Sequence, residues 1–227
     1  MAYLAERIAK AGLEIKAIKL NPGNPFQWAS GYRMPIYNDN RMFLFYPKHR
    51  DLIRYNFVNL IHEINLPDII AGTSTAGIAP GALVANNLNL PFIYIRDKPK
   101  EHGLKNQIEG IDAEKDLEKR KVIVIEDLIS TGESSARAVE AVRNANGISE
   151  YCLSIFNYGF DKAAQLLNDL KPKCEVISLL DYNTLLKVAK EIGYLNDEQI
   201  KLLEEWRADP FGWGEKHGFP KVEKDKK

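Results

Sequence analysis

Short apolar runs alternate with longer amphipathic stretches along most of the chain. Each run is rich in isoleucine, leucine or valine, which is typical of strands buried on both faces of a sheet. These runs predict strands at 68–72, 91–95, 121–127, 152–158 and 174–180. Apolar spacing predicts helices at about 77–88, 134–145, 160–169, 181–191 and 197–207. Strands alternating with helices indicate an α/β fold whose central, mainly parallel sheet is flanked by helices.

The first part of the chain follows a different pattern. Loosely periodic apolar positions predict a helix from Tyr3 to Ile18. Residues 21–41 are dense in proline, glycine, asparagine and aromatic residues, a composition that suits turns and short extended pieces. Apolar residues at helical spacing resume after Pro47 and predict another helix. Proline is favoured in the first turn of a helix, which supports a start at Pro47.

These patterns predict one domain over residues 1–215. About residues 1–45 form a small N-terminal subregion of that domain. Residues 216–227 end in KVEKDKK and are expected to be a polar tail, since they carry too little apolar surface to pack.

The charge balance points to a local site rather than to a charged surface. Lysine plus arginine and aspartate plus glutamate each number 31, so no overall field favours nucleic acid or an anionic membrane. Cys152 and Cys174 lack CxxC spacing, and the four histidines form no metal-binding motif. A disulfide framework, a zinc site and a nucleic-acid partner are therefore not expected.

The uncharged stretch 69–95 is long enough to cross a bilayer, but its prolines and asparagines favour a buried unit of a soluble sheet. The N-terminus lacks the order of a signal peptide, in which basic residues precede an apolar run. We therefore expect a cytoplasmic protein without a membrane span.

The strongest chemical motif is VIVIEDLISTGESS at residues 122–135. It places Glu126 and Asp127 at the carboxyl end of a buried strand, where open α/β sheets bind ligands. The next residues, Ser130 to Ser134, offer hydroxyls and backbone N–H groups at a helix N-terminus, which suits a phosphate monoester. The two carboxylates suit a neighbouring pair of sugar hydroxyls. The alternative is a strand that ends in a solvated acidic turn.

A second motif, IRDKPKEHGLKNQIEG, covers residues 95–110. Its cations are Arg96, Lys98, Lys100, His102 and Lys105. A cationic flap between glycines would stabilise the negative charge that builds on a departing pyrophosphate, and it would exclude water. The alternative is an ordinary solvated loop.

Taken together, these segments resemble the orotate phosphoribosyltransferases, within the type I phosphoribosyltransferase family. Residues 122–135 resemble the family's motif for phosphoribosyl pyrophosphate (PRPP), and Lys100 to Gly103 follow the order of its catalytic flexible loop. Residues 25–41 resemble the hood that covers orotate, and 70–91 resemble the turn that contacts pyrophosphate. LEEWRADP at 203–210 resembles a C-terminal segment of a bacterial subgroup, to which we assign no chemical role.

The resemblance implies transfer of the phosphoribosyl group from PRPP to N1 of orotate, in pyrimidine biosynthesis. It also implies Mg as the cofactor, carried by substrate oxygens without a dedicated protein site, and a homodimer that shares the flexible loop across its interface. Lys100, His102 and Asp127 would be catalytic, and Ser130 would also lie close to orotate. The implied PRPP-binding residues are Arg96, Lys100, His102, Glu126, Asp127, Leu128, Ile129, Ser130, Thr131, Gly132, Glu133 and Ser134.

Four positions depart from the family pattern. Ala29, Ala76 and Asp97 stand where many members carry lysine, which removes cations from around two anionic substrates. Arg33, Arg41, Lys98 or backbone amides are expected to make up part of the contact. Glu133 replaces a common glycine and is expected to point outward.

Two alternatives remain from the sequence. A phosphoribosyltransferase for another base would share the PRPP motif, and only the hood and flap favour orotate. A regulatory PRPP-binding protein that acts on nucleic acid would carry a basic face or an added domain, neither of which the sequence supplies.

Overall fold

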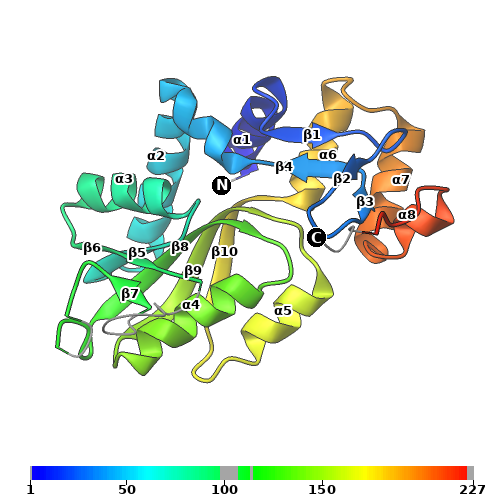
Figure 1. Ribbon diagram of the computed structural model, residues 1–227. Helices are drawn as coiled ribbons and strands as arrows, with labels where there is room; N and C mark the ends of the chain where they lie inside the picture. Colours follow the sequence, from blue (N-terminus) through cyan, green and yellow to red (C-terminus); the bar gives the residue numbers. More distant parts are fainter. Residues whose placement is uncertain (1, 98–106, 113–114, 224–227) are drawn as a thin grey trace.

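The computed structural model describes residues 2–97, 107–112 and 115–223. Its centre is a six-stranded sheet in the order β10-β9-β8-β5-β6-β7 (Figure 1). The first five strands are parallel, and β7 is antiparallel to β6. The strands are β5 (Ile69–Thr73), β6 (Phe92–Ile95), β7 (Ile108–Glu109), β8 (Lys121–Ile129), β9 (Ile148–Asn157) and β10 (Glu175–Asp181). The expected α/β fold with a mainly parallel sheet is confirmed.

Helices cover both faces of this sheet. Two of them, α4 (Glu133–Asn144) and α5 (Asp161–Asn168), pack on one face, where they share a core with Val122 and Val124 of β8. The other face carries a larger core, to which β8 contributes Ile123 and Ile125. Its helices are α1 (Ala2–Glu14), α2 (Pro47–Ile64), α3 (Ile78–Leu88) and α6 (Tyr182–Glu191).

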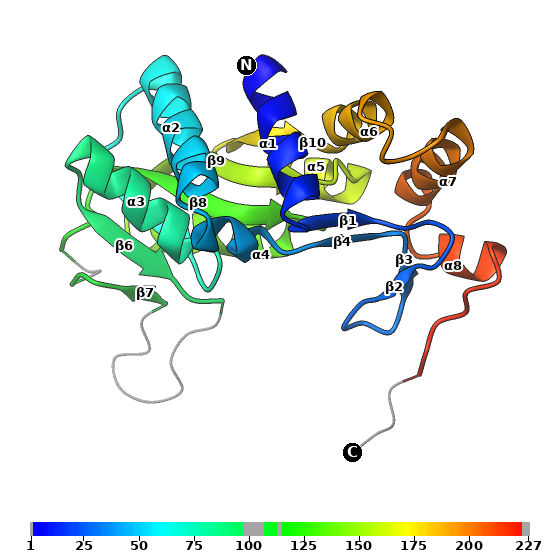
Figure 2. The same ribbon diagram turned by 90° about the horizontal axis from the view of Figure 1, so that it is seen from above.

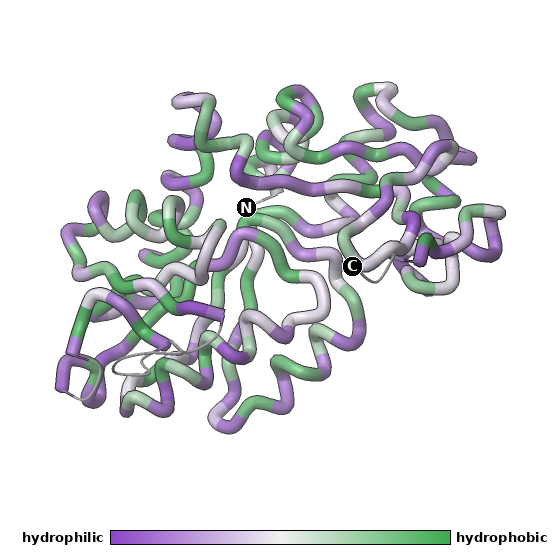
Figure 3. The backbone as a smooth tube through the Cα atoms, viewed as in Figure 1, coloured by the Kyte–Doolittle hydropathy of each residue, from purple (hydrophilic) through white to green (hydrophobic). Residues whose placement is uncertain are grey.

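Hydropathy along the chain explains this layering. All five residues of β5 are buried, as a central strand between two helical layers requires. In Figure 3 the outer helices alternate between hydrophilic and hydrophobic colours, because each helix buries one side only.

The N-terminal segment forms two small antiparallel pairs outside the main sheet. The strand β1 (Ile18–Leu20) pairs with β4 (Ile36–Asn38), and β2 (Phe26–Gln27) pairs with β3 (Arg33–Met34). A 3-10 helix, η1 (Asn40–Phe45), then leads into α2. We call residues 18–45 the hood.

The expected helix from Tyr3 to Ile18 is too long. It ends at Glu14, because Lys16 adopts a left-handed conformation, with φ of 59°, and turns the chain. Ile18 then pairs with Asn38 in a strand. The third predicted strand is too short. It was expected to end with Glu126 and Asp127, but β8 continues for two more residues, to Ile129.

The C-terminal part packs next to the hood (Figure 2). It contains α7 (Asp197–Ala208), which begins with a capping box between Asn196 and Gln199, and the short helix α8 (Trp213–Lys216). Beyond α8 the chain runs back along the hood, where the N–H of Val222 donates to the carbonyl of Gly31 at 3.0 Å. Within the described ranges, no helix is long and apolar enough to cross a membrane.

Candidate active site

The acid pair lies in the middle of the sheet, on the strand between β5 and β9. Glu126 and Asp127 are adjacent on this strand, and their carboxyl groups interact with each other. Glu126 is only 6% exposed, and its Oε1 accepts hydrogen bonds from Thr73 Oγ1 at 2.6 Å and from the Asp127 N–H at 3.0 Å. Asp127 lies on the hood side, where its charge acts on Arg41 and Tyr158.

Burial governs the ionisation of both acids. It raises the pKa of Glu126 to about 8; the Thr73 hydrogen bond opposes this rise, and the negative charge of Asp127 adds to it. Burial also raises the pKa of Asp127, against hydrogen bonds that favour its carboxylate form. Glu126 is therefore largely protonated at neutral pH in this structure, whereas the sequence suggested an ordinary carboxylate acceptor.

The turn after β5 lies directly beside this pair. It runs from Thr73 to Gly77, and the Thr73 hydroxyl also lies 3.3 Å from the carbonyl oxygen of Ile125. A side chain at Gly77 would overlap that same carbonyl and Thr73. Glycine at this position therefore lets the turn approach β8 closely, so that the turn and the acid pair form one surface.

The predicted phosphate loop connects β8 to α4. Gly132 adopts φ of +78°, and a Cβ there would lie 3.2 Å from the Cα of Ala163 on α5, so both conformation and space favour glycine. The first N–H groups of α4 have no side-chain cap among the described residues, and an anion would satisfy them. Glu133 points outward and pairs with Lys162 at 2.8 Å, which offsets its charge near the loop.

The other residues of this loop differ in what they expose. Ser130 and Thr131 are half-buried, and Ser134 is exposed. Ile129 is fully buried, and its carbonyl accepts the N–H of Tyr158 at 3.1 Å, so its side chain belongs to the core.

Arg96 stands at the end of β6, where the predicted flap begins. Its backbone N–H donates to the Gln107 carbonyl at 2.9 Å, and its guanidinium lies 3.6 Å from Glu109 of β7. Asp97, which stands where many family members carry lysine, forms a surface ion pair with Arg137 of α4. The predicted flap residues Lys98, Lys100, His102 and Lys105 lie outside the described residues.

The hood reaches the acid pair through Asn40. Its Nδ2 donates to the backbone carbonyl of Asp127 at 2.7 Å, across 87 residues of sequence. Arg41 forms a two-point contact with Asp39, at 2.7 and 2.9 Å. Next to it, a narrow cavity is lined by Arg41, Arg50, Arg54 and Ala76, so three arginines surround one position where the family often has lysine.

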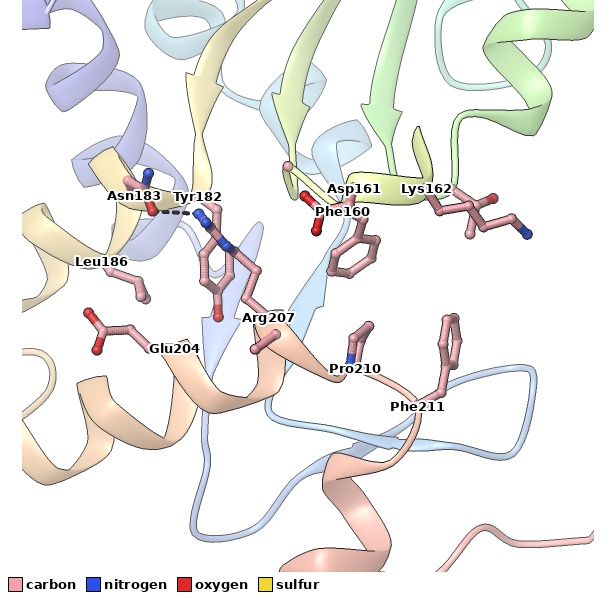
Figure 4. Close-up of a pocket in the computed structure, with 13 residues that line it drawn as sticks. Phe160, Asp161, Lys162, Tyr182, Asn183, Leu186, Glu204, Arg207, Pro210 and Phe211 are labelled. Carbon is pink, nitrogen blue, oxygen red and sulfur yellow. Dashed lines mark hydrogen bonds between the residues drawn. The ribbon is translucent and has the colours of Figure 1, made fainter. Parts of the chain in front are cut away.

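A cavity of about 650 Å³ lies to one side of these groups. Among its described lining residues, Thr131 alone belongs to the predicted site. The other lining residues come from the β9–α5 turn, α5, α6, α7 and the segment after α7, and they include Phe160, Arg207 and Phe211 (Figure 4). The part of the chain that the structure describes contains no group of three acids, histidines or cysteines able to hold a metal ion.

The comparisons with known proteins bear on this geometry. The model of the phosphoribosyl transferase domain matches residues 46–187, more than half of the chain. An orotate phosphoribosyltransferase from Porphyromonas gingivalis is 45% identical over 216 residues, which cover 94% of this chain and 100% of that protein. The chain belongs to the orotate phosphoribosyltransferase family.

Solved structures agree at the level of the fold. The structure of Leishmania donovani UMP synthase has a TM-score of 0.72 and 25% identity, and the match covers 90% of this chain and 42% of that one. The orotate phosphoribosyltransferase from Aeropyrum pernix has a TM-score of 0.65 and 22% identity, with 82% and 99% covered. The sheet described above is therefore the type I phosphoribosyltransferase sheet.

Three residues of this candidate site were missed from the sequence. Thr73 lies within a segment assigned to the pyrophosphate turn, but its bond to Glu126 depends on two strands becoming neighbours. Asn40 lies in the hood motif, but no local sequence pattern indicates its hydrogen bond to Asp127. Tyr158 ends a predicted strand, and nothing in the sequence distinguished it from an ordinary core tyrosine.

Proposed function

We propose that the chain transfers the 5-phosphoribosyl group from PRPP to N1 of orotate, giving orotidine 5'-phosphate and pyrophosphate in the synthesis of UMP. The observation that carries this proposal is the 45% identity to an orotate phosphoribosyltransferase over 94% of the chain. That match extends beyond residues 46–187, so it includes parts of the chain outside the phosphoribosyl transferase domain.

PRPP would lie across the carboxyl end of the sheet. Its 5-phosphate would occupy the loop from Leu128 to Ser134, with the N–H groups at the start of α4 as donors. Asp127 would accept hydrogen bonds from the ribose hydroxyls. The pyrophosphate would face the turn at Thr73–Gly77, within reach of Arg96.

Glu126 would join the ribose contact once it loses its proton. Its raised pKa comes mainly from burial, and hydrogen-bond donors in a substrate would favour the carboxylate. PRPP binding is then expected to release a proton near neutral pH. The Thr73 hydroxyl would keep the carboxylate oriented during this change.

Mg would enter with the substrate. Mg²⁺ keeps several water or substrate ligands and seldom uses an all-protein cage, so oxygens of the pyrophosphate and ribose of PRPP would supply its ligands. When bound, Mg would neutralise charge on pyrophosphate and thereby favour its departure.

Orotate would lie between the hood and the phosphate loop, near Ser130. The bond from C1 of the ribose to pyrophosphate would break, N1 of orotate would attack with inversion, and positive charge would develop on the ribose. Asp127 lies on the hood side of β8, where its carboxylate would offset that charge. Lys100 and His102 would stabilise the leaving pyrophosphate.

The same proposal includes a cytoplasmic homodimer in which the 98–106 segment serves the partner's site. Exposed apolar side chains on η1 and α2 support an interface there. They are Phe45, which is 83% exposed, Met42 and Tyr55, with Tyr46 at the junction of the two elements. Exposed apolar side chains that gather on one surface favour a contact with another protein.

The test follows orotate absorbance after purified protein is mixed with PRPP and Mg. Uracil, hypoxanthine and adenine are run in parallel. Consumption of orotate alone, and only with both PRPP and Mg, is the expected result. Consumption of another base, or PRPP binding without turnover, would replace the orotate assignment.

A further inference from the structure

The hood is not part of the central sheet. Neither the β1–β4 pair nor the β2–β3 pair joins the six-stranded sheet. Its strands are two or three residues long, and so short a pair is at most marginally stable alone. The position of the hood therefore depends on contacts with other parts of the chain.

The C-terminal segment supplies such a contact through Trp206 of α7. Trp206 is fully buried, and its indole N–H points to the sulfur of Met34 at 3.0 Å. Its ring also meets that of Trp28 edge-on, with centroids 6.3 Å apart. Both partners belong to the hood, and Trp28 in turn donates from Nε1 to the Ile36 carbonyl at 2.9 Å. Trp206 thus contacts both arms of the β2–β3 hairpin, at Trp28, which directly follows β2, and at Met34 in β3.

Trp206 also contacts the turn between β9 and α5, and Trp28 of the hood reaches the same turn, with its ring centroid 5.8 Å from that of Tyr158. The ring centroids of Tyr158 and Phe160 each lie 5.5 Å from that of Trp206. This turn rests on the phosphate loop, because the Tyr158 N–H donates to the Ile129 carbonyl. Trp206 consequently bridges the hood and the loop that would hold the 5-phosphate.

Further contacts fasten the outer edge of the hood to the same C-terminal segment. Tyr32 packs edge-on against Phe211, with centroids 5.1 Å apart, and Lys221 Nζ lies 4.3 Å from the Tyr32 ring centroid. Gly31 has φ of +87°, and a Cβ there would overlap the Val222 carbonyl. Beside the cluster, packing is interrupted by the 650 Å³ cavity, which Phe160 and Phe211 line (Figure 4). The bridge at Trp206 is therefore local.

We propose that Trp206 is a positioning residue that fixes the hood over the base site, and that this is the role of the segment at 203–210. The inference rests on the proposed function, because it takes the hood as the cover of orotate. Trp206 itself does not touch the substrates. It acts through its contacts with Trp28 and Met34 of the hood and with Tyr158 and Phe160 of the β9–α5 turn. Its loss would remove these contacts from a cluster in which Trp28 and Tyr158 also touch each other.

The test compares Trp206→Leu and Trp206→Phe with the full-length wild type. The leucine variant loses the aromatic contacts and the N–H, and its KM for orotate is expected to rise roughly 5- to 10-fold. Its KM for PRPP should stay within about twofold. Phenylalanine restores ring packing and should recover most of the orotate KM.

Trp213→Phe is the matched control. Trp213 is a buried tryptophan of the same segment, and its ring contacts are with His217 and Phe219. Its helix α8 adjoins β3 of the hood, so this variant disturbs the packing of the segment while it keeps the contacts of Trp206. It should lower thermal stability without changing either KM. Phe211→Ala keeps the hood testable if the Trp206 variants fail to fold. Phe211 is 45% exposed, so its substitution should leave the fold intact. A smaller rise in the orotate KM, roughly two- to threefold, is expected from its single ring contact with Tyr32.

Hydrogen exchange supplies a readout independent of activity. Peptides covering residues 26–38 should exchange faster in Trp206→Leu than in wild type, and the increase should be much smaller in Trp213→Phe. Unchanged hood exchange, or equal rises in both KM values, would overturn the positioning role. Inactive wild-type protein with faster hood exchange in Trp206→Leu would instead refute the proposed function and leave the bridge intact.

Discussion

On the phosphate-loop side of the site, Thr73 and Glu126 belong to neighbouring strands of one continuous sheet, and the loop passes directly into α4. On the hood side, two short strand pairs stand apart from that sheet. They are held by contacts with distant residues, such as Asn40 with Asp127 and Met34 with Trp206, and by burial of their apolar side chains in the larger core. The order of the strands positions the phosphate-loop side, whereas side-chain contacts position the hood side.

This difference matches the parts of the reaction that each side would serve. PRPP is common to all phosphoribosyltransferases, so a rigid sheet edge suits it. The base differs among them, and a separately fastened hood can change without disturbing the sheet. We therefore expect substitutions on the two sides to separate PRPP effects from orotate effects.

The largest effect is expected from Lys100→Ala. This lysine would act on the leaving pyrophosphate, so its loss should lower kcat roughly 100- to 1000-fold while PRPP affinity changes far less. Single-turnover kinetics and calorimetric titration with PRPP measure the two quantities. Lys115→Ala, which removes an exposed lysine, is the control. A kcat equal to wild type would remove Lys100 from catalysis.

Asp127→Asn should act on binding. The substitution keeps the shape of the side chain and removes its charge, so PRPP affinity should fall roughly 10- to 100-fold. Titration of each variant with PRPP and Mg gives this ratio, and Asp169→Asn on the exposed surface serves for comparison. An unchanged dissociation constant would contradict the ribose assignment and, with it, the separation of the two sides.

Glu126→Gln tests how the buried carboxyl group of Glu126, on the sheet side, makes the folding stability depend on pH. The folded protein holds the Glu126 proton up to a pKa of about 8, whereas the unfolded chain releases it near 4.5. Wild-type stability from this group is therefore full below pH 4.5 and falls as pH rises to about 8, by at most roughly 1.4 kcal/mol per pH unit. Glutamine does not titrate. The variant without substrates should consequently unfold at a higher temperature than wild type at pH 8, and the two should converge at pH 5. Parallel melting curves across that range would rule out the raised pKa.

Asn40→Ala should have the smallest effect. It leaves the Asp127 carbonyl without its donor and loosens the hood, so the orotate KM should rise about fivefold and the PRPP KM less. Asn56→Ala is a close control, because Asn56 is also buried and donates at 2.7 Å, but to Leu52 within α2. If both variants lose stability equally and neither changes the orotate KM, the Asn40 link is structural only.

The sheet side could be predicted from the sequence almost residue by residue. The runs at 68–72 and 121–127 correspond to β5 and β8, and the helix after Gly132 begins one residue earlier than expected. Local apolar patterning suffices there, since each strand is buried and each loop carries its own glycine.

The rest depended on partners that lie far away in the sequence. The burial of Glu126 follows from a strand that continues to Ile129 and from Thr73, which is 53 residues away. The strand β1 begins where the predicted helix would have ended, because Ile18 pairs with Asn38 of β4. The segment around Trp206 was predicted only as a helix at 197–207. No pattern within either segment indicates the contact between Trp206 and Met34.

The contact between Trp206 and Met34 also has a consequence during synthesis. The two residues are 172 positions apart, and ribosomes add about 5–20 residues per second. Trp206 is therefore made roughly 10 to 35 seconds after the hood residue that it supports. Throughout that interval the nascent hood has apolar surface without its native cover, so slower translation of the stretch before α7 should lengthen the time in which chaperones or other nascent chains can bind it.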